Sequence, residues 1–340
     1  MKDRSPSSDR LRLVILMPVF RDWDVAGLLC RQIDQQLALL DCVDVGILLV
    51  DDGSPEPLSG WSPFEPAHIG RIDVLRLRRN MGHQRAIAMG LCVIESEIQC
   101  DSILVMDADG EDQPQDVIRL INCFREKPTC IVFAARQRRF ESLVFRVGYW
   151  GYRLLHRLLT GTSVREGNFS IIPRLALDRL VTMSELWNHY AGAIYKSRLA
   201  HFRLWADRGR RLGGKSHMDV VALVVHGLAG ISTFYDVVAT RILIASVSCL
   251  LVLGMALSVV FGIRLLTDLA IPGWATFTAG LLLLLMIQFA SISFSLVFSL
   301  ITTRLNMTFV PIRDYRVFVD KLETLWNSAK EATAPENGTL

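Results

Sequence analysis

The stretch Ser102-Ile-Leu-Val-Met-Asp107-Ala-Asp109-Gly-Glu111-Asp112-Gln-Pro114 decides the fold. Its first part is an apolar run without alternation, which is typical of a strand buried on both faces of a sheet. Its second part places four carboxylates in one short turn. Clustered carboxylates repel one another unless a cation lies among them, so packing does not explain them. The stretch therefore predicts a buried strand that ends at a site for a hard divalent ion with a diphosphate ligand.

Strand and helix patterns alternate around this stretch, over residues 11–135. Apolar runs predict strands at 13–17, 45–50, 72–77, 102–106 and 130–135, and helical spacing predicts helices at 25–40, 82–95 and 114–126. Pro114 suits the first turn of the last helix. This order predicts an α/β fold, a Rossmann-like and mostly parallel sheet with helices on both faces.

A second acidic motif, Asp51-Asp52-Gly53-Ser54, follows the strand at 45–50. Ligands of such sheets bind beyond the carboxyl ends of the strands, where both acidic motifs fall. A plain turn with a helix cap explains the second motif equally well when it is taken alone. Two acidic strand ends on one sheet edge favour a binding site.

Two long stretches, 243–263 and 274–303, carry no charged residue. Each exceeds the roughly 20 helical residues that span a bilayer. Buried core helices of a soluble protein are the alternative, which two uncharged stretches of this length disfavour. The link between them contains Pro272-Gly273, a turn signal. We therefore expect an antiparallel transmembrane hairpin.

Basic residues flank the hairpin on the side of both chain ends, whereas the link holds only Arg264 and Asp268. The positive-inside rule then predicts a multi-pass protein of the cytoplasmic (inner) membrane, with the catalytic domain and both termini cytoplasmic. No signal-peptide core follows residues 1–10. The seven cysteines show no metal-binding spacing and suit a reducing compartment.

Five segments follow from these patterns. They are a polar extension (1–10), a cytoplasmic catalytic domain (11–217), a juxtamembrane segment (218–240), the hairpin (241–305) and a cytoplasmic tail (306–340). An amphipathic helix predicted within 141–160 either packs in the core or lies at the membrane interface in contact with lipids. The net charge of +3, without a basic and aromatic pattern, excludes a nucleic-acid partner.

Four motifs in order resemble the inverting family 2 glycosyltransferases with the GT-A fold. They are Pro18-Val-Phe20, Val50-Asp-Asp-Gly-Ser54, Asn80-Met-Gly-His-Gln-Arg-Ala86 and Met106-Asp-Ala-Asp-Gly-Glu-Asp-Gln-Pro114. The likeness is greatest to the dolichyl- and polyprenyl-phosphate mannosyl- and glucosyltransferases. It covers about residues 11–135. A looser likeness continues through Arg208-Gly-Arg-Arg-Leu-Gly-Gly-Lys-Ser216 and the hairpin.

The resemblance implies a role for each matched residue. It implies donor-nucleotide binding by Pro18, Phe20, Asp51, Asp52 and Arg85. It implies catalytic roles for Asp107, Asp109 and Asp112, with Asp107, Asp109 and Glu111 as ligands of Mg²⁺ or Mn²⁺. Such an ion neutralises the charge that builds on a diphosphate leaving group, and it needs few protein carboxylates because the phosphates supply the other ligands.

Two departures from the family pattern leave the sugar and the base open, so the donor is UDP- or GDP-linked. Arg21-Asp22 stands where the family usually has Asn-Glu. Asp109-Gly-Glu111 stands where Asp-Leu-Gln is commoner.

The acceptor follows from charge. A phosphate monoester arrives largely ionised at pH 7, so it needs cations to hold it and no general base. Basic residues suit this role, and we predict acceptor-phosphate binding by Arg136, Arg210, Arg211, Lys215 and Ser216. Attraction of anionic lipid headgroups is the alternative. For His83, His189 and His217 we expect structural roles.

The sequence thus predicts an enzyme that moves a sugar from a nucleotide-sugar to polyprenyl (undecaprenyl or dolichyl) phosphate. One alternative is a polysaccharide synthase with a hydroxyl acceptor, although its usual Gln-x-x-Arg-Trp pattern and further spans are missing. Another is a non-catalytic, membrane-anchored scaffold that binds nucleotide-sugars. Homo-oligomerisation stays open.

Overall fold

The computed structural model describes residues 10–136, 143–162, 166–206, 209, 211–213, 220–267, 271–305 and 309–328. The chain forms two compact units. The first holds Met1–Arg146, Val164–Thr233 and Phe309–Leu340, and the second holds Val147–Ser163 and Phe234–Thr308.

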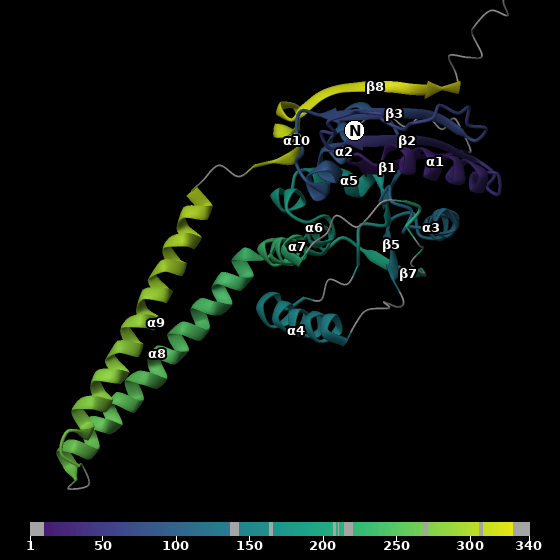
Figure 1. Ribbon diagram of the computed structural model, residues 1–340. Coiled ribbons are helices and arrows are strands. Elements are labelled where there is room, and N and C mark those ends of the chain that lie inside the picture. The colour runs from purple at the N-terminus through teal and green to yellow at the C-terminus, as the bar shows by residue number, and fades with distance from the viewer. Residues whose placement is uncertain are drawn as a thin grey trace, which may run out of the picture. The chain divides into compact units, whose positions relative to one another are not determined.

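An eight-stranded sheet forms the centre of the first unit (Figure 1). Its order is β7-β5-β6-β4-β1-β2-β3-β8. The strands are β1 (Leu11–Val19), β2 (Val43–Asp51), β3 (Ile69–Leu77), β4 (Ser102–Val105), β5 (Ile131–Arg136), β6 (Ser170–Pro173), β7 (His201–Ala206) and β8 (Val319–Asn327). The five predicted strands correspond to β1 to β5.

The central strands are parallel, as predicted. β1 pairs in parallel with β2 and β4, β2 with β3, and β5 with β7. β6 pairs antiparallel with β4 and β5, and β8 pairs antiparallel with β3. The expected α/β sheet is therefore confirmed, with two antiparallel strands that the sequence patterns did not predict.

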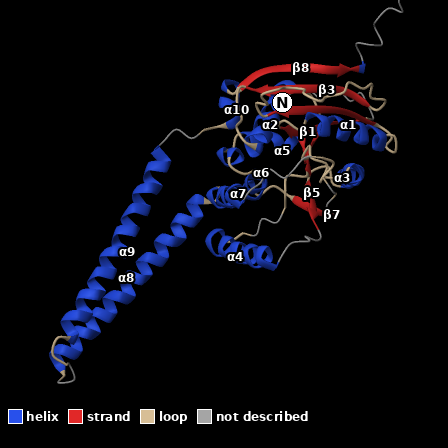
Figure 2. Cartoon of the chain, viewed as in Figure 1, coloured by secondary structure: helices blue, strands red, loops and turns tan. Residues whose placement is uncertain are grey.

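Helices cover both faces of the sheet (Figure 2). The helices of this unit are α1 (Trp23–Leu37), α2 (His83–Glu97), α3 (Pro114–Glu126), α5 (Arg174–Val181), α6 (Tyr190–Ser197), α7 (Val220–Ser232) and α10 (Pro311–Asp314), with short 3₁₀ turns at Ser184–Trp187 and Tyr315–Val317. Side chains alternate along β1, so Ile15 and Met17 pack with α1 and α3, whereas Val14 and Leu16 pack with α2. This alternation buries the sheet on both faces.

The structure differs from the expected domain division after the hairpin. Residues 306–340 were expected to form a tail outside the catalytic domain. Instead β8 completes the sheet beside β3, with Leu75 opposite Leu322 (Figure 1). The residues of β8 are half-buried or exposed, as is usual for an edge strand. Its sequence therefore lacks the continuous apolar run that marks a central strand.

The second unit consists of α8 (Tyr235–Leu266), α9 (Trp274–Leu305) and most of α4 (Leu143–Thr160). α8 and α9 pack as a helical hairpin (Figure 1). Both helices are long and apolar enough to cross a membrane, with mean hydropathies of 2.5 for Tyr235–Leu266 and 2.3 for Trp274–Thr302. The predicted apolar helices at 243–263 and 274–303 lie within them.

Candidate active site

The carboxyl ends of β2, β1 and β4 bring the two acidic motifs to one edge of the sheet. In the strand register Val19 lies opposite Asp51. The Asp52 N–H donates to the Val19 carbonyl at 2.9 Å, and the Met106 N–H donates to the Leu16 carbonyl at 3.1 Å. The acidic motifs therefore follow the strands on either side of β1.

Asp51 and Asp52 are almost fully buried, and backbone N–H groups hold both carboxylates. Asp51 Oδ1 accepts from the Ser54 N–H at 2.9 Å. Asp52 accepts from the N–H groups of Met81 at 2.6 Å and Gly82 at 2.9 Å. Burial raises the pKa of Asp52, while these two N–H groups act against the rise. The Asp52 carboxylate therefore joins the loop after β2 to the segment before α2, whereas the Asp51 carboxylate holds its own loop.

Gly53 is required where this loop meets the segment before α2. Its φ is +71°, and a Cβ atom there would lie 2.4 Å from the backbone carbon of Arg79. Both the left-handed backbone and the close approach exclude other residues.

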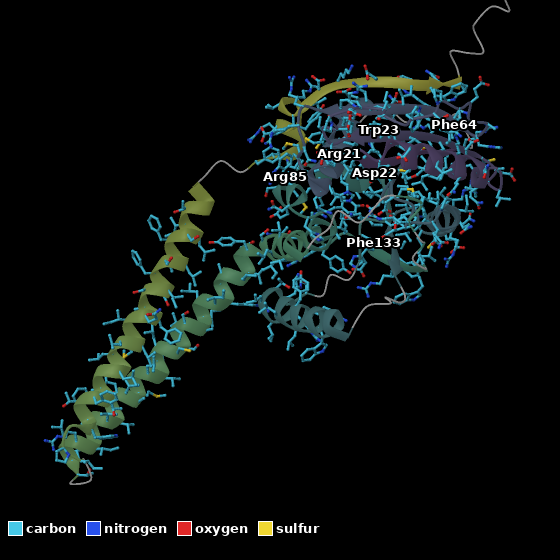
Figure 3. All side chains as sticks on the ribbon, in the orientation of Figure 1. Arg21, Asp22, Trp23, Phe64, Arg85 and Phe133 are labelled. Carbon is cyan, nitrogen blue, oxygen red and sulfur yellow. The ribbon has the colours of Figure 1, made fainter. Side chains whose placement is uncertain are left out.

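Pro18, Phe20 and Arg85 are the other residues predicted to bind the donor nucleotide. Pro18 is buried in β1, and half-buried Phe20 follows the strand. The Arg21 guanidinium lies 5.1 Å from the Phe20 ring centroid, and the Arg21 N–H donates to Ser54 Oγ at 3.0 Å. Figure 3 labels Arg21 at the start of α1 and Arg85 on α2. The Arg85 guanidinium lies 5.1 Å from the Trp187 ring centroid.

Hydrogen bonds within the acidic turn fix its shape. Asp112 is buried and its Oδ2 accepts from the Asp107 N–H at 3.0 Å. Asp109 Oδ1 accepts from the Glu111 N–H at 2.9 Å. The turn therefore holds the predicted catalytic and metal-binding residues close together.

Arg211 lies against the acidic turn. Its Nη2 is 2.8 Å from Asp109 Oδ2, and its Nε is 3.7 Å from Glu111 Oε1. Burial raises the pKa of the Asp109 carboxyl, the charges of Asp107 and Glu111 add to the rise, and Arg211 opposes it. A guanidinium thus supplies the positive charge that the clustered carboxylates need.

Backbone hydrogen bonds of Gly209 and Leu212, on either side of Arg211, hold this segment against the acidic turn. The Gly209 N–H donates to the Glu111 carbonyl at 2.9 Å, and the Leu212 N–H donates to the Asp109 carbonyl at 3.1 Å. Gly110 has a φ of +81°, and a Cβ atom there would lie 2.4 Å from Leu212 Cγ. This contact accounts for Gly110, one of the departures from the family pattern.

Of the five residues predicted to bind the acceptor phosphate, the structure describes the side chain of Arg211 alone, which lies against the acidic turn, and its role stays a prediction. Arg210, Lys215 and Ser216 fall outside the described residues, as does the side chain of Arg136 at the end of β5. Their role stays a prediction.

His83, for which we expect a structural role, lies against the acidic turn, and that role stays a prediction. Its Nε2 lies 3.0 Å from Asp107 Oδ1. Burial, the largest effect, lowers the pKa of His83, but the carboxylates around it, above all Asp107, outweigh burial and raise the pKa. His189 does have a structural role, because its Nδ1 accepts from the Gly192 N–H at 3.0 Å and caps α6.

Sequence patterns missed Asn168, which reaches the same carboxylate. Asn168 Nδ2 lies 2.9 Å from His83 Nε2 and 3.4 Å from Asp107 Oδ1. Asn168 sits just before β6, a strand of four residues without a sequence signal. A cavity of about 520 Å³ between residues 61–65 and the end of β8 shares none of the residues of the acidic edge.

The part of the sequence that forms this acidic edge matches a known protein family. Residues 14–181 match the model "Glycosyl transferase family 2". The chain is 26% identical over 242 residues to the uncharacterized glycosyltransferase YkcC of Bacillus subtilis, covering 68% of this chain and 71% of that protein. It is 30% identical over 156 residues to the undecaprenyl-phosphate 4-deoxy-4-formamido-L-arabinose transferase of Klebsiella pneumoniae, covering 45% and 44%, so this match spans less than half of either protein.

Among solved structures, the chain is similar to the glucosyl-3-phosphoglycerate synthase of Mycobacterium tuberculosis in complex with Mn²⁺, uridine diphosphate and glucosyl-3-phosphoglycerate. The TM-score is 0.47 at 16% identity, covering 67% of this chain and 80% of that one. The acidic edge lies within the matched residues of the family model. Residues 14–181 therefore form a Glycosyl transferase family 2 domain, and the chain is a glycosyltransferase enzyme.

Proposed function

We propose that this glycosyltransferase is membrane-bound and transfers a sugar, with inversion, from a UDP- or GDP-linked donor to polyprenyl phosphate at the cytoplasmic face. The observation that carries the proposal is the acidic turn, in which Arg211 pairs with Asp109 and Glu111 beside the strand end of the Asp51-Asp52 motif. Clustered carboxylates at this edge suit a cation that carries a diphosphate.

The residues of the turn fit Mg²⁺ or Mn²⁺. Among the described residues, no three His, Cys, Asp or Glu side chains are assembled as a metal site. Such ions need only one or two protein carboxylates, since substrate phosphates and water supply the other ligands. Asp107 and Asp109 would hold the ion, with Glu111 as a third ligand. The bound ion would neutralise charge that builds on the diphosphate leaving group.

Arg211 gains a second role in this proposal. Arg211 now supplies positive charge to Asp109 at 2.8 Å, and it would give up this contact if Asp107 and Asp109 held a cation. Its guanidinium would then be free to bind the diphosphate or the incoming phosphate with two parallel hydrogen bonds. This assignment joins the predicted acceptor-phosphate role of Arg211 to its observed contacts with Asp109 and Glu111.

A lipid phosphate as acceptor is supported by two independent features. One relative is named as an undecaprenyl-phosphate sugar transferase. The ionised phosphate needs no general base, which agrees with basic residues at 208–216 and with a turn whose carboxylates are engaged with cationic and N–H groups. The proposed membrane helices would bring the enzyme to such an acceptor.

The second unit supports attachment to the membrane. Within it, Arg241 Nη1 donates to the Leu158 carbonyl at 2.7 Å, and the His156 ring centroid lies 6.2 Å from that of Phe234. These contacts hold α4 against the first turns of α8. α4 exposes Trp150 (66%) and Leu158 (64%). The exposed apolar face favours the membrane-interface alternative for this helix over core packing.

The proposal is tested by weighing the lipid product. Purified protein is incubated with undecaprenyl phosphate, Mn²⁺ and a panel of UDP- and GDP-sugars, with EDTA in a parallel series. We expect one sugar per lipid and no product with EDTA. A long polymer would support the synthase alternative, and nucleotide-sugar binding without product would support the scaffold.

Cysteine labelling tests the cytoplasmic placement. Cys42 is exposed on the first unit, whereas Cys30, Cys92 and Cys100 are buried. Burial raises the pKa of the Cys30 thiol to about 12, so it stays unreactive at neutral pH. An impermeant maleimide should label Cys42 only after the cells are permeabilised, with Cys42→Ser as the control. Labelling of Cys42 in intact cells would contradict the cytoplasmic placement and show the opposite orientation.

A further inference from the structure

Two amide side chains connect Asp107 to the backbone of α6. The Tyr190 N–H donates to Gln84 Oε1 at 2.7 Å, and Gln84 Nε2 donates to Asn168 Oδ1 at 3.1 Å. Asn168 Nδ2 then lies 2.9 Å from His83 Nε2 and 3.4 Å from Asp107 Oδ1. The chain of contacts ends on a carboxylate of the acidic turn.

The direction of this chain is fixed by its first member. A backbone N–H can only donate, so the oxygen of the Gln84 amide must face Tyr190. The Gln84 amino group then faces Asn168, whose oxygen must accept. The Asn168 amino group is left to face Asp107 and His83. Both amide orientations therefore follow from one unambiguous donor.

The surroundings hold Asn168 rigidly. Ser170 Oγ donates to the Asn168 carbonyl at 3.0 Å and lies 2.6 Å from the hydroxyl of Tyr190. Ser170 and Tyr190 are fully buried, and burial raises the pKa of the Tyr190 hydroxyl. The start of β6 and the start of α6 thus support one amide that reaches the acidic turn.

We propose that Gln84 and Asn168 are positioning residues of the donor site. The Asn168 amino group donates to Asp107 Oδ1 and holds this carboxylate in place for the metal, and the two amides link this site to the first turn of α6. The inference rests on the proposed function only in that Asp107 binds the metal. Loss of a residue that orients a metal ligand typically weakens metal binding by about 10- to 100-fold.

The test is the affinity for Mn²⁺ in the presence of UDP or GDP and without acceptor, measured by calorimetric titration of the purified full chain. The variants are Gln84→Met, Asn168→Leu and the double variant, which remove the amides at similar size without adding charge. We expect each single variant to bind Mn²⁺ about 10- to 100-fold more weakly. The double variant should lose little more, because both residues act through one chain of hydrogen bonds.

A matched control separates positioning from stability. Thr324→Val removes a 2.7 Å hydrogen bond to buried Asp73, away from the acidic turn. It should lower the melting temperature and leave the Mn²⁺ affinity unchanged. If Asn168→Leu fails to fold, the Mn²⁺ affinity of Gln84→Met tests the proposal alone, because Gln84 is only half-buried.

Each outcome of this experiment bears on the proposal. Equal Mn²⁺ affinity in parent and variants would overturn the positioning role and leave the proposed function intact. Fully additive losses would overturn the shared chain. A parent that binds no Mn²⁺ would overturn the metal assignment and this inference together, whereas the mass of the lipid product tests the acceptor separately.

Discussion

Asp34 on α1 and Asp109 in the acidic turn are both largely removed from solvent, with an exposed fraction of 9% for the whole Asp34 residue and 17% for the Asp109 side chain. Their partners differ. Asp34 accepts three backbone N–H groups, from Ala67 at 3.0 Å, His68 at 2.8 Å and Ile69 at 3.0 Å. Asp109 depends on the side chain of Arg211 at 2.8 Å, besides one N–H of its own turn.

This difference separates a structural carboxylate from one that can take part in chemistry. Backbone N–H groups cannot leave without unfolding their segment, so Asp34 is committed to holding the loop before β3. A side chain can turn away, so in the proposed function Asp109 would exchange its guanidinium partner for a metal ion. Asp52 resembles Asp34, because the backbone of Met81 and Gly82 holds it.

The largest effect on turnover is expected for Asp109→Asn. Loss of one charged ligand of the proposed metal should lower the rate of nucleoside diphosphate release on the order of 10³-fold. The melting temperature should not fall, because no backbone donor loses its acceptor entirely. Turnover is measured with Mn²⁺, donor and undecaprenyl phosphate. Turnover equal to that of the parent would refute the role of this carboxylate.

The opposite pattern is expected for Asp34→Ala. Three N–H groups lose their acceptor, and each buried donor left without one costs about 1–3 kcal/mol. Because the loop can partly reach water, we expect unfolding to become easier by about 3 kcal/mol. Denaturant unfolding measures the loss, and calorimetry should show unchanged Mn²⁺ affinity of the folded fraction. Weaker Mn²⁺ binding by folded Asp34→Ala would contradict the purely structural role of Asp34.

Binding of Mn²⁺ with UDP or GDP should stabilise the parent. A ligand present at 100 times its dissociation constant stabilises the folded state by about 2.7 kcal/mol. The gain appears as a higher melting temperature that EDTA reverses. The same ligands should have little effect on Asp109→Asn, and an equal rise in that variant would place the metal elsewhere.

Gly110→Ala tests the shape of the turn. A non-glycine residue at a φ of +81° costs about 1–2 kcal/mol, and the new Cβ would push Leu212 away. Arg211 should shift with Leu212, so turnover falls together with stability. Gly46→Ala is the matched control, since its Cβ would meet only the Arg71 carbonyl at 3.8 Å. Equal effects of both substitutions would argue against a special role for this turn.

The smallest effect concerns pH. Burial raises the pKa of Asp109, so ionisation is harder in the folded state than in the unfolded state. The metal-free parent therefore loses stability relative to Asp109→Asn as pH rises above about 3.9, the ordinary value for Asp. Melting temperatures in EDTA at pH 4 and pH 7 measure this difference. A variant that becomes less stable than the parent at pH 7 would contradict the assigned cost of the charge.

The acidic edge was predictable because its signals are local. The run from Ile103 to Met106 marks a buried strand, and the carboxylates follow it directly in sequence. Parallel strands then bring Asp51 to the same edge as Asp107. Local patterning and one topological rule suffice for this part of the site.

The rest depends on pairing between distant segments. Asn168 reaches Asp107 because β6 inserts antiparallel between β4 and β5, and its four residues carry no periodic signal. β8 pairs with β3 across about 250 residues of sequence, and an edge strand with polar side chains resembles a tail. His83 belongs to a quoted motif, but only the fold shows its contact with Asp107.

The most direct test of the exchangeable carboxylate is the position of Mn²⁺ itself. Anomalous diffraction from crystals grown with Mn²⁺ and UDP or GDP locates the ion. We predict Mn²⁺ about 2 Å from oxygens of Asp107 and Asp109, with Arg211 turned away from its present 2.8 Å contact with Asp109. An ion bound elsewhere, or an Asp109–Arg211 pair that persists in the complex, would contradict the account.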